Sequence, residues 1–100
     1  MTNHDLKTWP QPFAAIRSGI KRHEIRKMDR DYKRGDRVTL REFYPTPSGA
    51  GGQTLENAPP PRGYTGHVIT ATIGYVTQPG EWGIPDGLCV FTLLNVEVAS

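Results

Sequence analysis

Residues 19–42 read GIKRHEIRKMDRDYKRGDRVTLRE, and the organisation expected for the rest of the chain follows from this stretch. Side chains alternate in character along 21–27 and again along 37–44, which is typical of β-strands. Between these two runs, the Gly35-Asp36 pair predicts a turn, because glycine accepts a positive φ and aspartate caps neighbouring amides. The stretch therefore predicts two charged strands joined by turns.

The alternation also predicts which side chains of 21–27 face the core. Successive side chains of a strand point to opposite faces. Ile25 is the apolar residue of this run, so it is expected to point inward, with His23 on the same face. Glu24 and Arg26 then share the opposite, outer face.

Residues 37–44 show the same alternation. Val38 and Leu40 fall on one face and are expected in the core. Glu42 shares their parity, which is unusual for a carboxylate. Either the end of this strand already lies in solvent, or Glu42 faces a cavity.

A short helix is expected over 10–18. Pro10 and Pro12 suit its first turn, where an amide donor is not needed, and Gly19 suits a left-handed position just after the helix. Apolar residues recur at spacings of four and three, which predicts a face that docks on the core: Trp9, Phe13 and Ile16.

Three further segments read as β-structure: 4–9 as a short strand or extended arm, and 64–77 and 88–98 as longer strands. The last has apolar residues on both faces, which favours a central or barrel-closing position. Residues 45–63 are rich in Pro and Gly and predict a long flexible loop within the domain. The expected fold is α+β, mainly β: a small barrel of about five strands with one or two flanking helices. A two-layer α+β sandwich is the alternative.

Length and composition limit what the protein can be. A chain of 100 residues with 36% hydrophobic residues predicts a single domain over 1–100. No apolar run approaches the roughly 20 residues that span a bilayer, and the N-terminus lacks a signal-peptide layout, so the expected location is the cytoplasm. The single cysteine, Cys89, permits no internal disulfide and is expected to be a buried small hydrophobe.

The positive charge is concentrated. Ten of the twelve Lys and Arg residues lie within 17–41 together with four acidic residues, so this segment carries +6 while the rest of the chain carries −4. Four acids cannot neutralise ten bases, which favours a phosphate-binding surface over a solvated face of local ion pairs. The candidate nucleic-acid-binding residues are Lys21, Arg26, Lys27 and Arg30, with Tyr44 and Trp82 as stacking platforms.

Lys21 and Glu24 form the sharper pattern. A lysine at the mouth of a pocket can act as a nucleophile or base, with a nearby carboxylate as its partner. Strict alternation would place the two on opposite faces, so the pairing requires a strand start or bulge near Arg22. A surface ion pair is the structural alternative.

Metal and cofactor chemistry find no support in the sequence. His4, His23 and His67 lack the short spacing of metal ligands. The glycines of 48–52 resemble a phosphate loop superficially, but no Gly-Lys-Ser/Thr follows. Trp82, in its Gly/Pro-rich loop, either offers a stacking surface or covers the end of the barrel.

Several of these elements together resemble a known family. The pattern Gly19-x-Lys21-x-x-Glu24-x-Arg26, the Gly35-Asp36 turn and the later Tyr64-Thr65-Gly66 are similar to the ASCH domains of the PUA-like superfamily. The resemblance is greatest to small stand-alone bacterial and phage members. It covers nearly the whole chain except 45–61, which resembles an insertion. It implies a small β-barrel with a cleft suited to RNA or a modified nucleoside.

Some relatives implied by this resemblance are enzymes. Small ASCH proteins that hydrolyse acetylcytidine resemble this chain at Lys21 but have threonine where this chain has Glu24. They also use a glutamate on a later strand, for which this chain offers only Glu42 and Glu81, neither of them equivalent. The chain thus departs from the pattern of these enzymes at two positions.

The leading hypothesis is a domain that binds RNA or a nucleotide in a basic cleft. The rival hypothesis is a small hydrolase of a modified nucleoside or of RNA, with Lys21 as nucleophile or base and Glu24 or Glu42 as its partner. A third is a domain whose basic face binds a host protein. The sequence leaves the oligomeric state and the ligand open.

Overall fold

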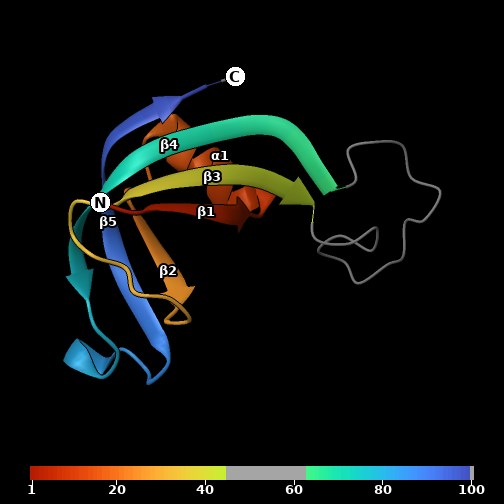
Figure 1. Cartoon of the computed structure of the whole chain (residues 1–100). Coiled ribbons are helices and arrows are strands. Elements are labelled where there is room, and N and C mark those ends of the chain that lie inside the picture. Colours follow the sequence, from red (N-terminus) through yellow and green to blue (C-terminus); the bar gives the residue numbers. More distant parts are fainter. Residues whose placement is uncertain (45–62, 100) are drawn as a thin grey trace, which may run out of the picture.

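The computed structural model describes residues 1–44 and 63–99. In chain order these residues form β1 (Asn3–Thr8), α1 (Pro10–Ser18), β2 (His23–Lys27), β3 (Arg37–Tyr44), β4 (Gly63–Thr77), a 3-10 turn (Glu81–Gly83) and β5 (Leu88–Val98) (Figure 1). The fold is α+β and mainly β, as predicted. The predicted loop 45–63 lies outside the described residues apart from Gly63, which begins β4.

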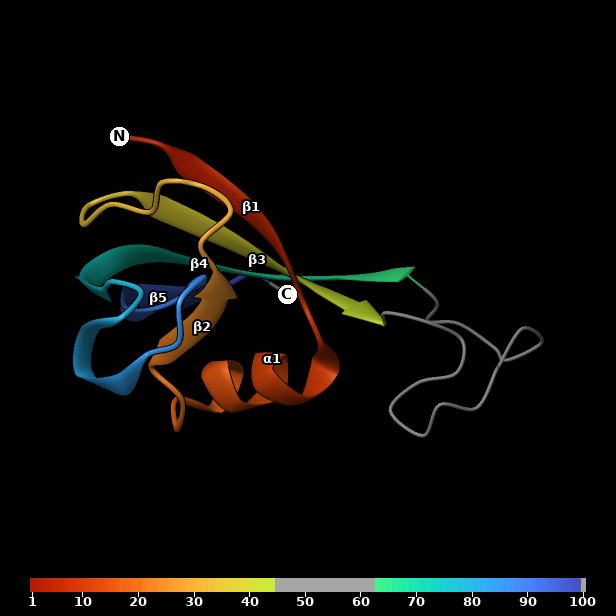
Figure 2. The ribbon, with the colours of Figure 1, turned by 90° about the horizontal axis from the view of Figure 1, so that it is seen from below.

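The five strands form one curved sheet in the order β1-β3-β4-β5-β2. β1 runs parallel to β3, and the other neighbouring pairs are antiparallel. The long strand β4 bends strongly: residues 63–72 pair with β3 and residues 69–77 pair with β5, and the sheet curls into a half-barrel (Figures 1 and 2). β5 is an inner strand, as its two apolar faces predicted. The half-barrel has β1 and β2 as its two edges.

The helix begins and ends where the sequence predicted. Pro10 occupies its first position, and Gly19 closes it at φ 90° with its amide donating to the carbonyl of Ile16 at 3.0 Å. Phe13 and Ile16 are fully buried. Trp9 does not dock on the core: it precedes the first helical residue, where the helical spacing does not yet apply, and is 59% exposed.

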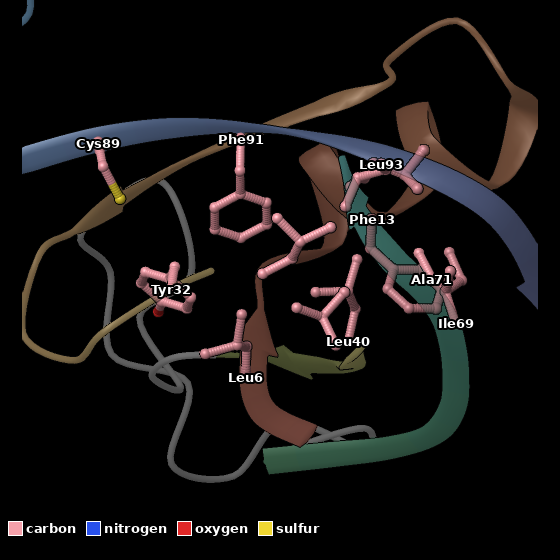
Figure 3. Close-up of a cluster of buried hydrophobic side chains, with 12 residues drawn as sticks. Leu6, Phe13, Tyr32, Leu40, Ile69, Ala71, Cys89, Phe91 and Leu93 are labelled. Carbon is pink, nitrogen blue, oxygen red and sulfur yellow. The ribbon is translucent and has the colours of Figure 1, made fainter. Parts of the chain in front are cut away.

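The core lies on the concave face of the sheet, under α1 (Figure 3). Alternate residues of part of each of the strands β3, β4 and β5 contribute to it, and Cys89 is fully buried among them, as predicted. The connection between β2 and β3 adds Tyr32, whose ring lies 4.9 Å from that of Phe91 and 4.8 Å from that of His4. This connection thus fills part of the open side of the half-barrel.

The face predicted for β2 is wrong. Ile25 is 56% exposed, whereas Glu24 is only 4% exposed. The prediction assumed that the apolar residue of an alternating strand must face inward. A carboxylate can take the inner position when its charge is compensated by cations and hydrogen bonds, and β2 provides both.

Asp36 anchors the turn before β3 to the first strand. Its carboxylate accepts hydrogen bonds from His4 Nε2 at 2.8 Å, from the Thr2 amide at 3.1 Å and from the Lys33 amide at 3.2 Å. Burial would raise the pKa of Asp36, but these three hydrogen bonds outweigh it and hold the pKa below its ordinary value of 3.8. Asp36 is therefore ionised in the folded protein at neutral pH.

None of the helices within 1–44 and 63–99 is long and apolar enough to cross a membrane.

Candidate functional site

Glu24 is the centre of a polar cluster at the edge of the half-barrel. Its Oε1 accepts a hydrogen bond from Lys21 Nζ at 3.3 Å, and its Oε2 accepts two from Arg26, at 2.9 Å from Nε and 2.7 Å from Nη2. A carboxylate that shares its two oxygens between two cations is neutralised and also holds both cations in place. The structure therefore brings Lys21, Glu24 and Arg26 together.

Lys21 reaches Glu24 because β2 begins only at His23. The strand alternation that would separate the two residues does not extend to Lys21, so the strand start required by the sequence pattern is present. Lys21 Nζ also donates to the carbonyl of His23 at 2.6 Å. Both of these partners of the amino group are acceptors, so Lys21 acts here as a cationic donor.

Arg26 also links the two edges of the sheet. Its Nη2 donates to Thr8 Oγ1 at 3.1 Å, which joins the edge strand β2 to the edge strand β1 by side chains. Thr8 is buried, and its partner in the parallel register with β3 is Glu42. The cluster thus serves the fold as a clasp across the open side of the half-barrel. Taken alone, this cluster contributes to the stability of the fold; a binding role also requires a surface that can receive a ligand.

A groove runs along the cluster of Lys21, Glu24 and Arg26, and we call it the basic groove. It consists of two adjoining hollows of about 420 and 520 Å³ that share Lys7, Arg26 and Lys27. The first hollow also contains Trp9, Lys21 and Glu24. The second extends to Asp5, Asp29, Arg30, Tyr32 and Tyr64. The groove therefore runs from the N-terminal end of α1, past β2, to the start of β4.

The basic groove has an excess of positive charge. Each carboxylate of the groove forms an ion pair with a neighbouring cation. Glu24 pairs with Lys21 and Arg26. Asp29 pairs with Arg30 at 3.5 Å, and Asp5 pairs with Arg41 at 2.7 Å. The exposed side chains of Lys7 and Lys27 lie on the walls that the two hollows share. The net charge of the groove is therefore carried mainly by these two lysines.

Two exposed aromatic side chains stand at the two ends of the groove. Trp9 lines the hollow beside Lys21, and Tyr64 lines the hollow beside Arg30. Tyr64 packs against Phe43 in an edge-to-face arrangement, with ring centroids 4.9 Å apart, and Lys7 lies 4.5 Å above the Phe43 ring. Trp9 and Tyr64 are 59% and 54% exposed, and an exposed aromatic ring can stack on a base.

The aromatic residues proposed from the sequence lie elsewhere. Tyr44 is at the last position of β3, and Trp82 is in the 3-10 turn with 91% of its surface exposed. Among the described residues that line the two hollows, neither is present. Tyr32 lines the second hollow but belongs to the core, where burial raises the pKa of its phenol against the opposing effect of Arg30. The sequence placed Lys21, Arg26, Lys27 and Arg30 in one site, and the structure does the same.

Glu42 is buried, as its parity indicated, but it belongs to a second cluster. Its Oε1 accepts hydrogen bonds from Thr65 Oγ1 at 2.9 Å and from His67 Nδ1 at 3.1 Å. Glu42 therefore contacts β4 and not Lys21. Of the two carboxylates proposed as acid/base partners of Lys21, only Glu24 lies beside it.

The geometry does not support a metal site or a reactive cysteine. Within the part of the chain that the structure describes, no group of three or more His, Cys, Asp or Glu residues is arranged to hold a metal ion. Burial raises the pKa of the Cys89 thiol, which keeps it protonated and unreactive.

The groove contains residues that the sequence reasoning missed. The sequence pattern predicts an opening strand for Lys7 and a core position for Trp9, and it indicates no binding role for Tyr64. A signal was present for Tyr64, whose parity along β4 matches the outer residues Val68 and Thr70. For Lys7 no such signal existed, because its place in the groove depends on β1 lying opposite β2.

Fold and groove define a small, mainly β domain of the α+β class with a basic groove at the open side of its half-barrel. The chain belongs to the DUF3850 family, which is described as a domain of unknown function, and the match spans residues 3–93. It therefore includes every groove residue named above. A search among curated proteins finds no match for the chain.

Proposed function

We propose that this protein is a single-stranded RNA-binding domain similar to the ASCH domains of the PUA-like superfamily, and that RNA lies in the basic groove. The observation that carries the proposal is the continuity of the groove. Two hollows are joined through Lys7, Arg26 and Lys27, with an exposed aromatic residue at each end.

The cations suit a phosphate backbone. Lys21 lines the first hollow and Arg30 the second, and three cations line both: Lys7, Arg26 and Lys27. An extended strand in the groove would therefore find donors for several successive phosphates. Glu24 fixes the side chains of Lys21 and Arg26 before any ligand arrives. Donors that are already ordered lose less side-chain entropy on binding, which favours affinity.

The aromatic residues favour a single strand over a duplex. Stacking on Trp9 or Tyr64 needs a base whose face is free, and bases in a duplex are stacked on one another. Stacking tolerates any base, so it adds affinity without a strong sequence preference. The geometry therefore supports a binder of single-stranded RNA with modest base preference.

A titration with single-stranded RNA at several salt concentrations tests this proposal. Each neutralised phosphate of a single strand contributes a slope of about −0.7 in log K against log salt, so five contacts predict a slope of about −3.5. Fluorescence anisotropy of a labelled oligouridylate gives both the affinity and the slope. Binding that is absent at low salt, or that does not respond to salt, would contradict the proposal.

A second function, hydrolysis of a modified nucleoside, is favoured by one observation. Lys21, Glu24 and the Thr8 hydroxyl meet around Arg26 in the same cluster, and the first hollow has a volume of about 420 Å³. The acceptors around Lys21 Nζ favour its role as a donor over that of a nucleophile. Incubation with acetylcytidine decides the matter: turnover that Lys21→Ala abolishes would replace the binding proposal.

A further inference from the structure

The second cluster, at Glu42, owes its existence to an irregularity in the sheet. Arg41 pairs with Val68 and Phe43 with Tyr64, so three residues of β4 stand opposite the single residue Glu42. Such a bulge redirects side chains that a regular strand would leave pointing away. Gly66, in its middle, has φ 93°, a value that residues with a side chain rarely adopt.

The bulge closes a ring of hydrogen bonds. The His67 amide donates to Thr65 Oγ1 at 3.1 Å, the Thr65 hydroxyl donates to Glu42 Oε1 at 2.9 Å, and His67 Nδ1 lies 3.1 Å from the same oxygen. An ionised carboxylate only accepts hydrogen bonds, so the hydrogen-bond network assigns the proton of the neutral imidazole to Nδ1. The other nitrogen, Nε2, is thereby defined as a hydrogen-bond acceptor.

His67 lies in continuation of the basic groove. His67 lines a hollow of about 410 Å³ together with Tyr64 and Asp5, and these two residues also line the groove. Tyr64 therefore stands between the groove on one side and His67 on the other. The sugar of a nucleotide whose base stacks on Tyr64 would lie either in the basic groove or next to His67.

We propose that His67 accepts a hydrogen bond from the ribose 2′-hydroxyl of the nucleotide stacked on Tyr64, so that the groove selects RNA over DNA. The inference rests on the proposed function and adds that the ribose 2′-hydroxyl is the group recognised. A 2′-hydroxyl is a donor that DNA lacks, and it is the group by which proteins distinguish the two nucleic acids at a given position. Glu42 acts as the positioning residue, because it fixes the tautomer that makes Nε2 an acceptor.

A purely structural role is the alternative. In that case the ring of hydrogen bonds holds the bulge in shape, and loss of His67 changes the stability of the protein but not its choice of ligand. The ratio of RNA affinity to DNA affinity separates the two roles, because a structural defect lowers both affinities together.

The test compares oligouridylate, oligodeoxyuridylate and the 2′-O-methyl form of the RNA, each titrated into the wild type and into His67→Phe. The wild type is expected to bind the RNA about three- to tenfold more tightly than the DNA, the effect of one hydrogen bond. The 2′-O-methyl form, which has lost its donor, is expected to bind like the DNA. His67→Phe keeps a ring and loses the acceptor, so it is expected to bind all three oligonucleotides with equal affinity.

Equal binding of RNA and DNA by the wild type overturns this inference and leaves the proposed function in place. A preference for RNA that persists in His67→Phe also overturns it. Binding of no oligonucleotide by the wild type overturns the proposed function itself. His67→Leu serves as a second variant should His67→Phe fail to fold, and thermal unfolding of each variant verifies the folded state.

Discussion

Glu24→Ala is expected to lower the free energy of unfolding by about 3 kcal/mol, at the lower end of the range for breaking a buried ion pair. The substitution removes the acceptor that holds Lys21 and Arg26, and it leaves two cations facing each other at the edge of the core. The lower end applies because the side chains of Lys21 and Arg26 remain 24% and 22% exposed and can turn toward water. Urea unfolding of wild type and variant measures the difference.

Two further variants show where the loss originates. Glu24→Gln keeps the shape and one acceptor oxygen and is expected to lose less. Arg26→Ala, alone and combined with Glu24→Ala, completes a double-mutant cycle that isolates the coupling between the two side chains. A loss below about 0.5 kcal/mol for Glu24→Ala would show that the cluster behaves as an ordinary surface ion pair and does not clasp the half-barrel.

Replacing Lys7 and Lys27 together by Ala is expected to weaken RNA binding by about tenfold or more and to reduce the salt slope by about 1.4, the contribution of two phosphate contacts. These two lysines line the walls that both hollows share. Their side chains are exposed, so the fold is expected to tolerate the change. Anisotropy titrations at several salt concentrations measure both quantities.

The matched control removes the same charge elsewhere. Lys33 and Arg34 are exposed residues of the connection between β2 and β3, and they line a different hollow, together with Tyr75 and Gln78. Lys33→Ala combined with Arg34→Ala is expected to change the affinity by less than about threefold, since only screened long-range attraction is lost. Equal losses in the two double variants would mean that RNA responds to net charge and not to the groove.

Much of the fold could be predicted because local signals and the global fold agree. Pro10 and Gly19 mark the ends of α1, and the alternation of Val38 and Leu40 gives the inner face of β3. The inner place of β5 in the sheet agrees with the apolar residues on both of its faces. In these elements the residues that the patterns place inside are buried, among them Phe13, Val38, Leu40 and Phe91.

The site could be predicted only in part, because its residues meet across the open side of the sheet. Lys21, Arg26 and Lys27 are close in sequence and were found together. Glu24 was placed on the wrong face, because no pattern in one strand shows that two cations will compensate a buried carboxylate. Trp9 was assigned to the core for its spacing alone.

The contact between Glu42 and His67 could not be predicted from the sequence, for a different reason. It depends on a shift in register between β3 and β4, two strands separated in sequence by the long segment 45–62. Hydrophobic alternation gives the face of each strand but not the register between strands so far apart. The parity of Glu42 left solvent and a cavity as alternatives; the side chain is buried, and its partner could not be named from the sequence.

The two tryptophans of the chain offer the most direct test of where RNA binds. Trp9 lines the basic groove, and Trp82 lies outside it in the 3-10 turn. Trp82→Phe leaves Trp9 as the only tryptophan, and Trp9→Phe leaves Trp82. Titration of both variants with single-stranded RNA is expected to give a saturable change of fluorescence in the Trp82→Phe protein and none in the Trp9→Phe protein. A change confined to the protein that retains Trp82 would contradict RNA binding in the basic groove.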